Sequence, residues 1–171
     1  MVITAGITGT ICASVLLIAG LMKINSLALF GKQVAAYQIA PERISELVGY
    51  ILPPAEIVLA IAMLFIPQLS AAAMLLFAAF AVAIGVNLLR GRTELRCGCF
   101  GVTGKQTISV AHFAANIGLS LLAALTFIEQ HRPTFLALQI GISAALVFLL
   151  ASAWRAMIPR PLPDTEEVPQ P

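Results

Sequence analysis

The feature that most constrains this chain is a series of apolar runs, each long enough to cross a membrane. Five runs hold almost no acidic, basic or histidine side chain: residues 3–22, 47–66, 69–89, 108–128 and 134–154. A helix needs roughly 20 consecutive apolar residues to span hydrocarbon. Because backbone polar groups in lipid need partners within the chain, runs of this length predict helices rather than strands.

The composition excludes the ordinary soluble classes of protein. Hydrophobic residues make up 60% of the 171 residues and charged residues only 11%, against roughly 25% charged in typical globular chains. A soluble enzyme is therefore excluded. The formal charge of +2 is too small to indicate nucleic-acid binding, so we expect no nucleic-acid partner and a lipid bilayer around the chain.

These runs predict an all-α, polytopic membrane bundle with a four-helix core and one additional transmembrane helix. Residues 1–155 form a single transmembrane domain, and residues 156–171, rich in proline and acid, form a disordered tail. Residues 24–46 differ from the spans, since apolar side chains recur there at helical spacing among polar ones. We predict an amphipathic interfacial segment with these apolar positions: Leu27, Phe30, Val34 and Tyr37.

The basic residues predict an orientation. With five spans, Arg132 falls alone on one side of the membrane, and nine basic residues fall on the other: Lys23, Lys32, Arg43, Arg90, Arg92, Arg96, Lys105, Arg155 and Arg160. Cytoplasmic loops carry an excess of Lys and Arg. In a bacterial inner membrane, we therefore expect the N-terminus outside, and the C-terminus and the loop between the third and fourth spans in the cytoplasm.

That loop contains the strongest chemical motif, Cys97-Gly98-Cys99. Two thiols one residue apart can form a disulfide only if the backbone bends, and Gly98 permits the bend. A strained bridge exchanges readily, and the positive charges of Arg96 and Lys105 favour the thiolate. The motif therefore predicts a redox pair, with Cys97 and Cys99 as the reacting residues.

Two other interpretations of the motif stay open. Cys97 and Cys99 can be small residues at a tight structural turn. They can also be metal ligands together with His112, although the sequence offers no evident fourth ligand. We expect no metal site and no bound cofactor, with a quinone or a metal ion as the alternatives.

Glu56 is the one carboxylate deep in a predicted span, and ionisable residues inside a membrane are functional candidates by default. Pro53 and Pro54 can restart the helix, which would make Glu56 a first-turn residue that offsets the helix dipole. Lys23 ends the first span on the same side of the membrane, so a Lys23–Glu56 ion pair is the second interpretation. A proton relay or a ligand contact is the third.

Two further residues are weaker candidates. His112 and Asn116 share one face of the fourth predicted span, close to the cysteine loop. His112 is either a packing residue or a proton donor to a thiolate. Cys12 lies in the middle of the first span, where a cysteine is usually a small hydrophobe, and a third redox thiol is its alternative role.

The run Arg96-Cys97-Gly98-Cys99-Phe100-Gly101 between apolar spans resembles the methylamine utilisation protein MauE family. The stretch from Gly20 to Lys23 and the stretch from Pro54 to Glu56 share this resemblance, which covers roughly residues 10 to 128. The wider relation is to DoxX-like membrane proteins, which keep the Lys and Glu features. The resemblance implies Cys97 and Cys99 as the redox pair, with Gly98, Arg96, Phe100, Gly101, Glu56, Lys23 and His112 supporting them.

The resemblance also implies partners. MauE-like proteins are expected to act with a thioredoxin-like protein of the MauD type in maturing an exported client, the methylamine dehydrogenase β-subunit. We therefore expect thiol–disulfide exchange at the Cys-Gly-Cys loop. The alternatives are a DoxX-like subunit that binds a quinone or another small hydrophobic molecule, and a noncatalytic membrane scaffold or metal-binding protein. The exported client conflicts with a cytoplasmic loop, since cytoplasmic thiols are kept reduced.

Overall fold

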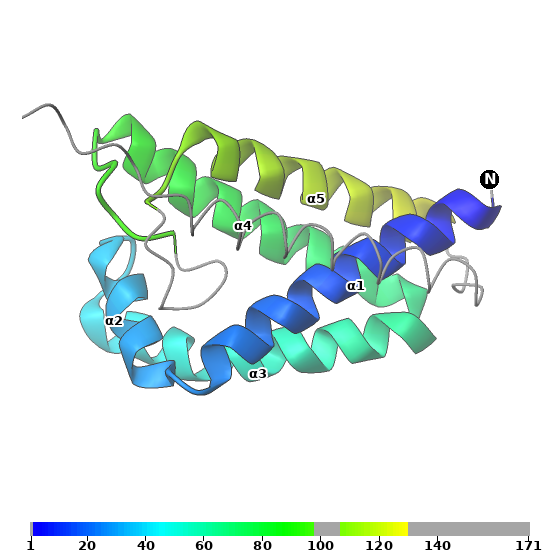
Figure 1. Ribbon diagram of the computed structural model, residues 1–171, viewed down its shortest axis with the longest axis horizontal. Helices are drawn as coiled ribbons and strands as arrows, with labels where there is room; N and C mark the ends of the chain where they lie inside the picture. The colour runs from blue at the N-terminus through cyan, green and yellow to red at the C-terminus, as the bar shows by residue number, and fades with distance from the viewer. Residues whose placement is uncertain (1, 98–106, 130–171) are drawn as a thin grey trace, which may run out of the picture.

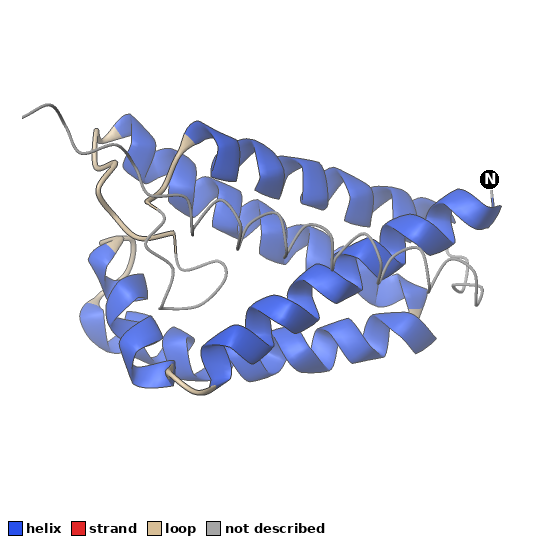
Figure 2. Cartoon of the chain, viewed as in Figure 1, coloured by secondary structure: helices blue, strands red, loops and turns tan. Residues whose placement is uncertain are grey.

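A computed structural model describes residues 2–97 and 107–129, and these residues are helical apart from short connections (Figure 2). The elements in chain order are α1 (Val2–Ile24), α2 (Leu27–Ala36), α3 (Glu42–Phe65), the 3-10 turn η1 (Pro67–Leu69), α4 (Ser70–Leu89) and α5 (Val110–Glu129). Within these residues, the β pairing is limited to one isolated bridge between Arg96 and Thr107. The predicted all-α bundle is therefore confirmed.

Within residues 2–97 and 107–129, four helical stretches are long and apolar enough to cross a membrane: α1, α3, η1 with α4, and α5. The chain is thus a multi-pass membrane protein. The many exposed leucine, isoleucine, valine and phenylalanine side chains on these helices suit a surface that faces lipid instead of water. The predicted span at 134–154 and the predicted tail at 156–171 lie outside the described residues.

The long helices form a bundle with α2 at one end (Figure 1). Helix α4 packs along α5, α1 packs along α3, and α1 also contacts α5. The core between them combines small alanine side chains with larger ones, and Leu16, Met63 and Phe77 are among its buried members. The carboxyl ends of α1 and α4 and the amino ends of α3 and α5 lie at the same end of the bundle as α2 (Figure 1).

Helix α2 forms within the predicted amphipathic segment and folds back onto α3. Gly31 and Gly49 make this possible, because a Cβ atom added at Gly49 would lie 2.3 Å from the Cα atom of Gly31. Gln38 has a φ of 51° and reverses the chain, so that α3 begins at Glu42. The segment therefore splits between α2, a turn and the first residues of α3.

Helix α3 continues through Pro53 and Pro54 from Glu42 to Phe65. The interpretation that these prolines restart the helix and leave Glu56 as a first-turn residue is therefore wrong. Proline inside a soluble helix is costly because it removes a hydrogen bond and crowds the preceding turn. Membrane helices tolerate it where neighbouring helices pack against the site, and Pro53 is buried.

Candidate functional site

A buried ion pair joins α1 to α3. The Nζ atom of Lys23 donates to both carboxylate oxygens of Glu56, at 2.8 and 2.9 Å. The side chains are 1% and 0% exposed, respectively. The predicted Lys23–Glu56 pair is therefore confirmed. A buried charge is costly unless it is paired and hydrogen-bonded, so each residue needs the other.

Gly20 allows the close approach of α1 and α3 that the ion pair requires. A Cβ atom at Gly20 would lie 2.7 Å from Cγ1 of Ile57 and 2.9 Å from the carbonyl oxygen of Pro53. Since Gly20 is one helical turn before Lys23, this contact places Lys23 directly opposite Glu56. Small residues at such crossings let membrane helices approach closely.

Two aromatic rings complete the surroundings of the Lys23 ammonium. Its Nζ atom lies 4.9 Å from the ring centroid of Phe30 on α2 and 5.4 Å from that of Phe80 on α4. Both distances allow a cation–π interaction. Side chains from α1, α2, α3 and α4 therefore meet at this single charge.

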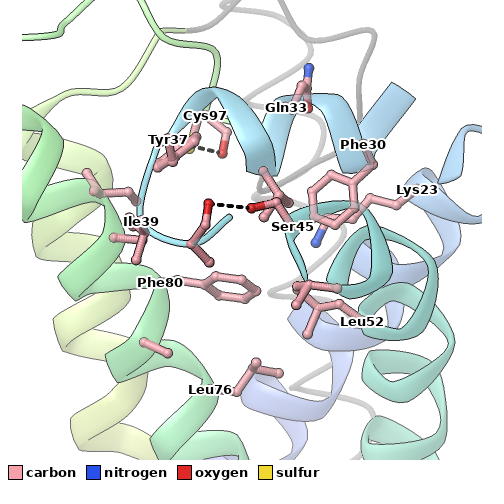
Figure 3. A pocket seen from close by; sticks show the side chains of 16 residues that line it. Lys23, Phe30, Gln33, Tyr37, Ile39, Ser45, Leu52, Leu76, Phe80 and Cys97 are labelled. Carbon is pink, nitrogen blue, oxygen red and sulfur yellow. Dashed lines mark hydrogen bonds between the residues drawn. The ribbon is translucent and has the colours of Figure 1, made fainter. Parts of the chain in front are cut away.

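Next to this charge is a cavity of about 300 Å³. Figure 3 shows side chains from α2, α3 and α4 directed into it around Lys23. The wall is almost entirely apolar and includes Phe30, Leu52, Leu76, Phe80 and Ile84. Such a cavity between helices, with few polar groups, is typical of a site for a small apolar ligand.

Gln33 adds an unusual polar group to the wall. Its Oε1 atom is buried and has no hydrogen-bond partner among the described residues. A second wall residue, Ser45, is satisfied, because its hydroxyl donates to the carbonyl oxygen of Ala40. Buried polar atoms are nearly always paired, so this unpaired oxygen is an exception within the described part of the chain.

Cys97 lies on the wall of the same cavity. The hydroxyl of Tyr37 donates to the backbone carbonyl oxygens of Arg96 and Cys97, at 3.2 and 3.1 Å. Figure 3 shows Tyr37 beside Cys97. The strand-like bridge between Arg96 and Thr107 holds the same segment from the other side. The first cysteine of the motif is thus held at the end of the bundle that carries α2.

Arg92 and Arg90 tie this loop to the turn after α2. The guanidinium of Arg92 donates to the carbonyl oxygen of Ala36 at 2.9 Å and to the side-chain oxygens of Gln38 and Asn87 at 3.2 Å. Arg90 donates to the backbone oxygen of Gln38 at 3.4 Å. Arg96, which the sequence predicted as a supporting residue, is exposed and contributes its backbone to the site.

His112 lies near the start of α5 and is not one of the residues that line the cavity. Its Nδ1 atom is 2.8 Å from the hydroxyl of Ser109, and the amide of Asn116 donates to its backbone oxygen at 2.9 Å. His112 and Asn116 therefore share one face of α5, as predicted. The structure therefore places Lys23 and Cys97 on the cavity wall, with Glu56 behind Lys23 as its ion-pair partner, and places His112 outside that wall.

The remaining motif residues Gly98, Cys99, Phe100 and Gly101 lie outside the described residues. Within residues 2–97 and 107–129, no three His, Cys, Asp or Glu side chains gather as a group that could hold a metal ion. Cys12 is fully buried, and its thiol donates to the carbonyl oxygen of Leu119 at 3.7 Å. It lies in the core cluster with Leu16 and Phe77, as expected for a packing residue.

Sequence reasoning missed Tyr37, Gln33 and Phe80 as site residues. Tyr37 was recognised only as an apolar position of an amphipathic helix, and its hydroxyl partners lie 59 and 60 residues away in the chain. A signal was present, since an amphipathic helix that carries aromatic residues beside Gln33 can face a cavity as well as lipid. No feature of the sequence around Phe80 indicates that its ring contacts Lys23.

Comparisons with known proteins agree with the resemblance noted in the motif. Residues 1–129 match the family described as methylamine utilisation protein MauE. The chain is 34% identical over 145 residues to a methylamine utilization protein MauE from Paracoccus denitrificans, covering 78% of this chain and 77% of that one. It is 37% identical over 121 residues to the protein of the same name from Paracoccus versutus, covering 67% of this chain and 64% of the relative. No solved structure matches the chain.

Proposed function

Because the chain belongs to the methylamine utilisation protein MauE family, we propose that it matures an exported, disulfide-containing protein through thiol–disulfide exchange. The reacting residues are Cys97 and Cys99, and the partner is a thioredoxin-like protein of the MauD type. The client is of the methylamine dehydrogenase β-subunit type, and the membrane is the bacterial inner membrane.

The observation that carries this proposal is the position of Cys97. Its backbone is anchored by Tyr37, and it lies where the bundle end meets the cavity. The side chain is partly exposed, in contrast to the fully buried Cys12. A thiol must be accessible to attack a disulfide, so Cys97 is the better placed of these two for exchange.

In the proposed reaction, one thiolate of the motif attacks the disulfide of the thioredoxin-like partner. A mixed disulfide forms and one partner thiolate leaves. The second motif cysteine then attacks the mixed disulfide, which releases the partner as a dithiol and leaves a Cys97–Cys99 disulfide. The reverse sequence returns the motif to its dithiol form. Lys23 and Glu56 act by holding the helices that support this loop.

We propose a cytoplasmic position for the Cys97 loop, on the basis of the nine basic residues that share its side in the five-span topology. A client that matures outside the cytoplasm then requires electrons to cross the bundle. Labelling the loop with a membrane-impermeant thiol reagent tests this orientation. A loop labelled only from the exported side would contradict the orientation and leave the exchange chemistry intact.

The experiment that tests the exchange is disulfide capture with single-cysteine motif variants. One of the variants Cys97→Ser and Cys99→Ser lacks the resolving thiol and keeps the attacking one. That variant should accumulate a mixed disulfide with a thioredoxin-like protein. Mass spectrometry of the crosslinked band identifies the partner. The control is the double variant, which keeps Cys12 and should capture nothing. Capture that persists in the double variant, or that never includes a thioredoxin-like protein, contradicts the proposal.

A further inference from the structure

The segment that leads into Cys97 carries an excess of positive charge. It runs from residue 90 to residue 96 and contains three arginines and one acid: Arg90, Arg92, Glu94 and Arg96. Arg92 is half-buried, and the other three side chains are exposed. Elsewhere in the described part of this bundle end, two exposed acids balance two exposed bases: Glu42, Glu46, Lys32 and Arg43. The excess of positive charge therefore falls on residues 90–96, which form the basic segment.

Hydrogen bonds hold two of these positive charges close to Cys97. The guanidinium of Arg90 donates to the backbone oxygen of Gln38, and that of Arg92 donates to the side-chain oxygen of the same residue. Gln38 directly follows Tyr37, whose hydroxyl donates to the carbonyl oxygen of Cys97 at 3.1 Å. One tyrosine side chain therefore separates two guanidinium groups from the residue that carries the thiol.

Charges at this distance act on any molecule that approaches the Cys97 thiol. Arg96 precedes Cys97 directly and is exposed, and the bridge between Arg96 and Thr107 fixes its backbone. Electrostatic interactions persist over roughly 10 Å at 0.1 M salt. An anionic group is therefore attracted to the partly exposed Cys97, and a cationic group is repelled from it.

We propose that the basic segment docks an acidic surface of the thioredoxin-like partner, next to the disulfide that Cys97 meets. This inference rests on the proposed thiol–disulfide exchange and names the chemistry of the partner surface at the same site. Complementary charges raise the rate of association and exclude wrong partners. A disulfide flanked by carboxylates is therefore favoured over one flanked by lysines, and added salt weakens the preference.

The first test isolates Cys97 in the Cys99→Ser variant of the full chain, in nanodiscs of phosphatidylcholine. Three small disulfides are the probes: dithiobis(nitrobenzoate), which is a dianion, cystamine, which is a dication, and neutral hydroxyethyl disulfide. In each reaction the Cys97 thiolate attacks one sulfur of the probe, a mixed disulfide forms, and the other half of the probe leaves as a thiolate. Intact-protein mass spectrometry measures the rate. The Cys97→Ser, Cys99→Ser double variant gives the background from Cys12.

Arg90→Gln and Arg96→Gln each remove one exposed positive charge from the basic segment, and Glu94→Gln removes its negative charge. The matched control is Arg43→Gln, at an exposed arginine of α3 outside the segment. At low salt, each Arg→Gln change in the segment should slow the dianion about threefold and speed the dication about threefold. Glu94→Gln should do the reverse. The neutral probe corrects for changes in access or in the thiolate fraction, since these alter all three rates together.

Two results of this test would overturn the basic segment as an anion-selective surface. One is a set of rates that change equally for the three probes or not at all. The other is a control Arg43→Gln that shifts the dianion-to-dication ratio as much as the changes in the segment do. Nanodiscs that contain phosphatidylglycerol test a lipid headgroup as the occupant of the same arginines. If Arg90→Gln and Arg96→Gln lose their effect there, headgroups neutralise the arginines, and docking of the partner is overturned.

The second test uses the partner in cells, in the single-cysteine variant that captures the thioredoxin-like protein. Arg96→Glu added to that variant should lower the yield of mixed disulfide several-fold, whereas Arg43→Glu should leave the yield unchanged. Size-exclusion profiles show that both chains are folded. An unchanged yield with Arg96→Glu overturns the docking inference and leaves the exchange intact. No capture in either single-cysteine variant overturns the exchange itself, whatever charge preference the small disulfides show.

Discussion

Lys23 and Glu56 form a two-point ion pair between α1 and α3, with the ammonium nitrogen 2.8 and 2.9 Å from the two carboxylate oxygens. Both side chains are buried, and the aromatic rings of Phe30 and Phe80 lie within 5.4 Å of the same nitrogen. The pair therefore fixes the relative position of the four helices that surround the cavity.

Removal of one partner of this pair should destabilise the protein strongly. Glu56→Gln leaves the Lys23 ammonium buried without a counter-charge, and breaking a buried pair in this way typically costs about 3–5 kcal/mol. The double variant Lys23→Met, Glu56→Met removes both charges and should recover most of that loss. Thermal unfolding in detergent measures the stability of the purified parent protein, the Glu56→Gln variant and the double variant. A Glu56→Gln protein as stable as the parent would show that the pair does not hold the helices.

The glycine contact between α2 and α3 should be equally sensitive to size. Gly49→Ala forces a methyl group to within 2.3 Å of the Gly31 Cα atom, so α2 must move away from α3. We expect a lower unfolding temperature. Gly118→Ala is the matched control in α5, since nothing lies within 4 Å of its added Cβ atom, and alanine favours the helix by about 1 kcal/mol. Equal loss of stability in both variants would contradict the packing role of Gly49.

Tyr37 should control how tightly the Cys97 segment is held. Tyr37→Phe removes the hydroxyl that donates to the carbonyl oxygens of Arg96 and Cys97, at a typical cost of about 1 kcal/mol. We expect Cys97 to react several-fold faster with a small maleimide in the variant. Tyr50→Phe is the control, because Tyr50 is 50% exposed on α3. An unchanged rate for Tyr37→Phe would mean that the bridge to Thr107 alone holds the segment.

Cys12 should be dispensable for any redox chemistry. It is fully buried in the core cluster with Leu16 and Phe77, and its thiol donates a hydrogen bond to the carbonyl oxygen of Leu119. Cys12→Ala should lower stability by about 1 kcal/mol through lost packing and leave partner capture at the motif unchanged. Quantitative alkylation checks the burial of Cys12, since its thiol should react only after the protein is denatured. Loss of partner capture in Cys12→Ala would place a third thiol in the relay.

The sequence predicted the helical bundle and the ion pair for a clear physical reason. Apolar runs can satisfy their backbone in lipid only as helices, and two opposite charges buried on the same side of the membrane need one another. The continuity of α3 through Pro53 and Pro54 was not predictable from local rules, because those rules describe helices in water. There, proline ends a helix unless tertiary packing compensates.

The cavity could be predicted only in part. Its components lie on separate helices, and the Gly31 and Gly49 contact that brings α2 over α3 depends on the three-dimensional crossing. No feature of the neighbouring sequence identifies the hydrogen-bond partners of Tyr37. Likewise, none indicates that the Oε1 atom of Gln33 has no partner among the described residues. The Lys23–Glu56 pair, by contrast, consists of two opposite charges that are costly to bury in a membrane, so its residue types identified it in advance. The redox role of the cysteine motif stays a prediction.

Thiol trapping in intact cells is the decisive test of thiol–disulfide exchange at this loop. Acid quenching followed by alkylation with a mass-shifting reagent reports the redox state of Cys97 and Cys99 in the parent and in the Cys97→Ser and Cys99→Ser variants. We expect the pair to be present as both dithiol and disulfide, and loss of the thioredoxin-like partner to move it to one form. A pair that stays fully reduced and unreactive, in cells with and without the partner, would contradict thiol–disulfide exchange at this loop.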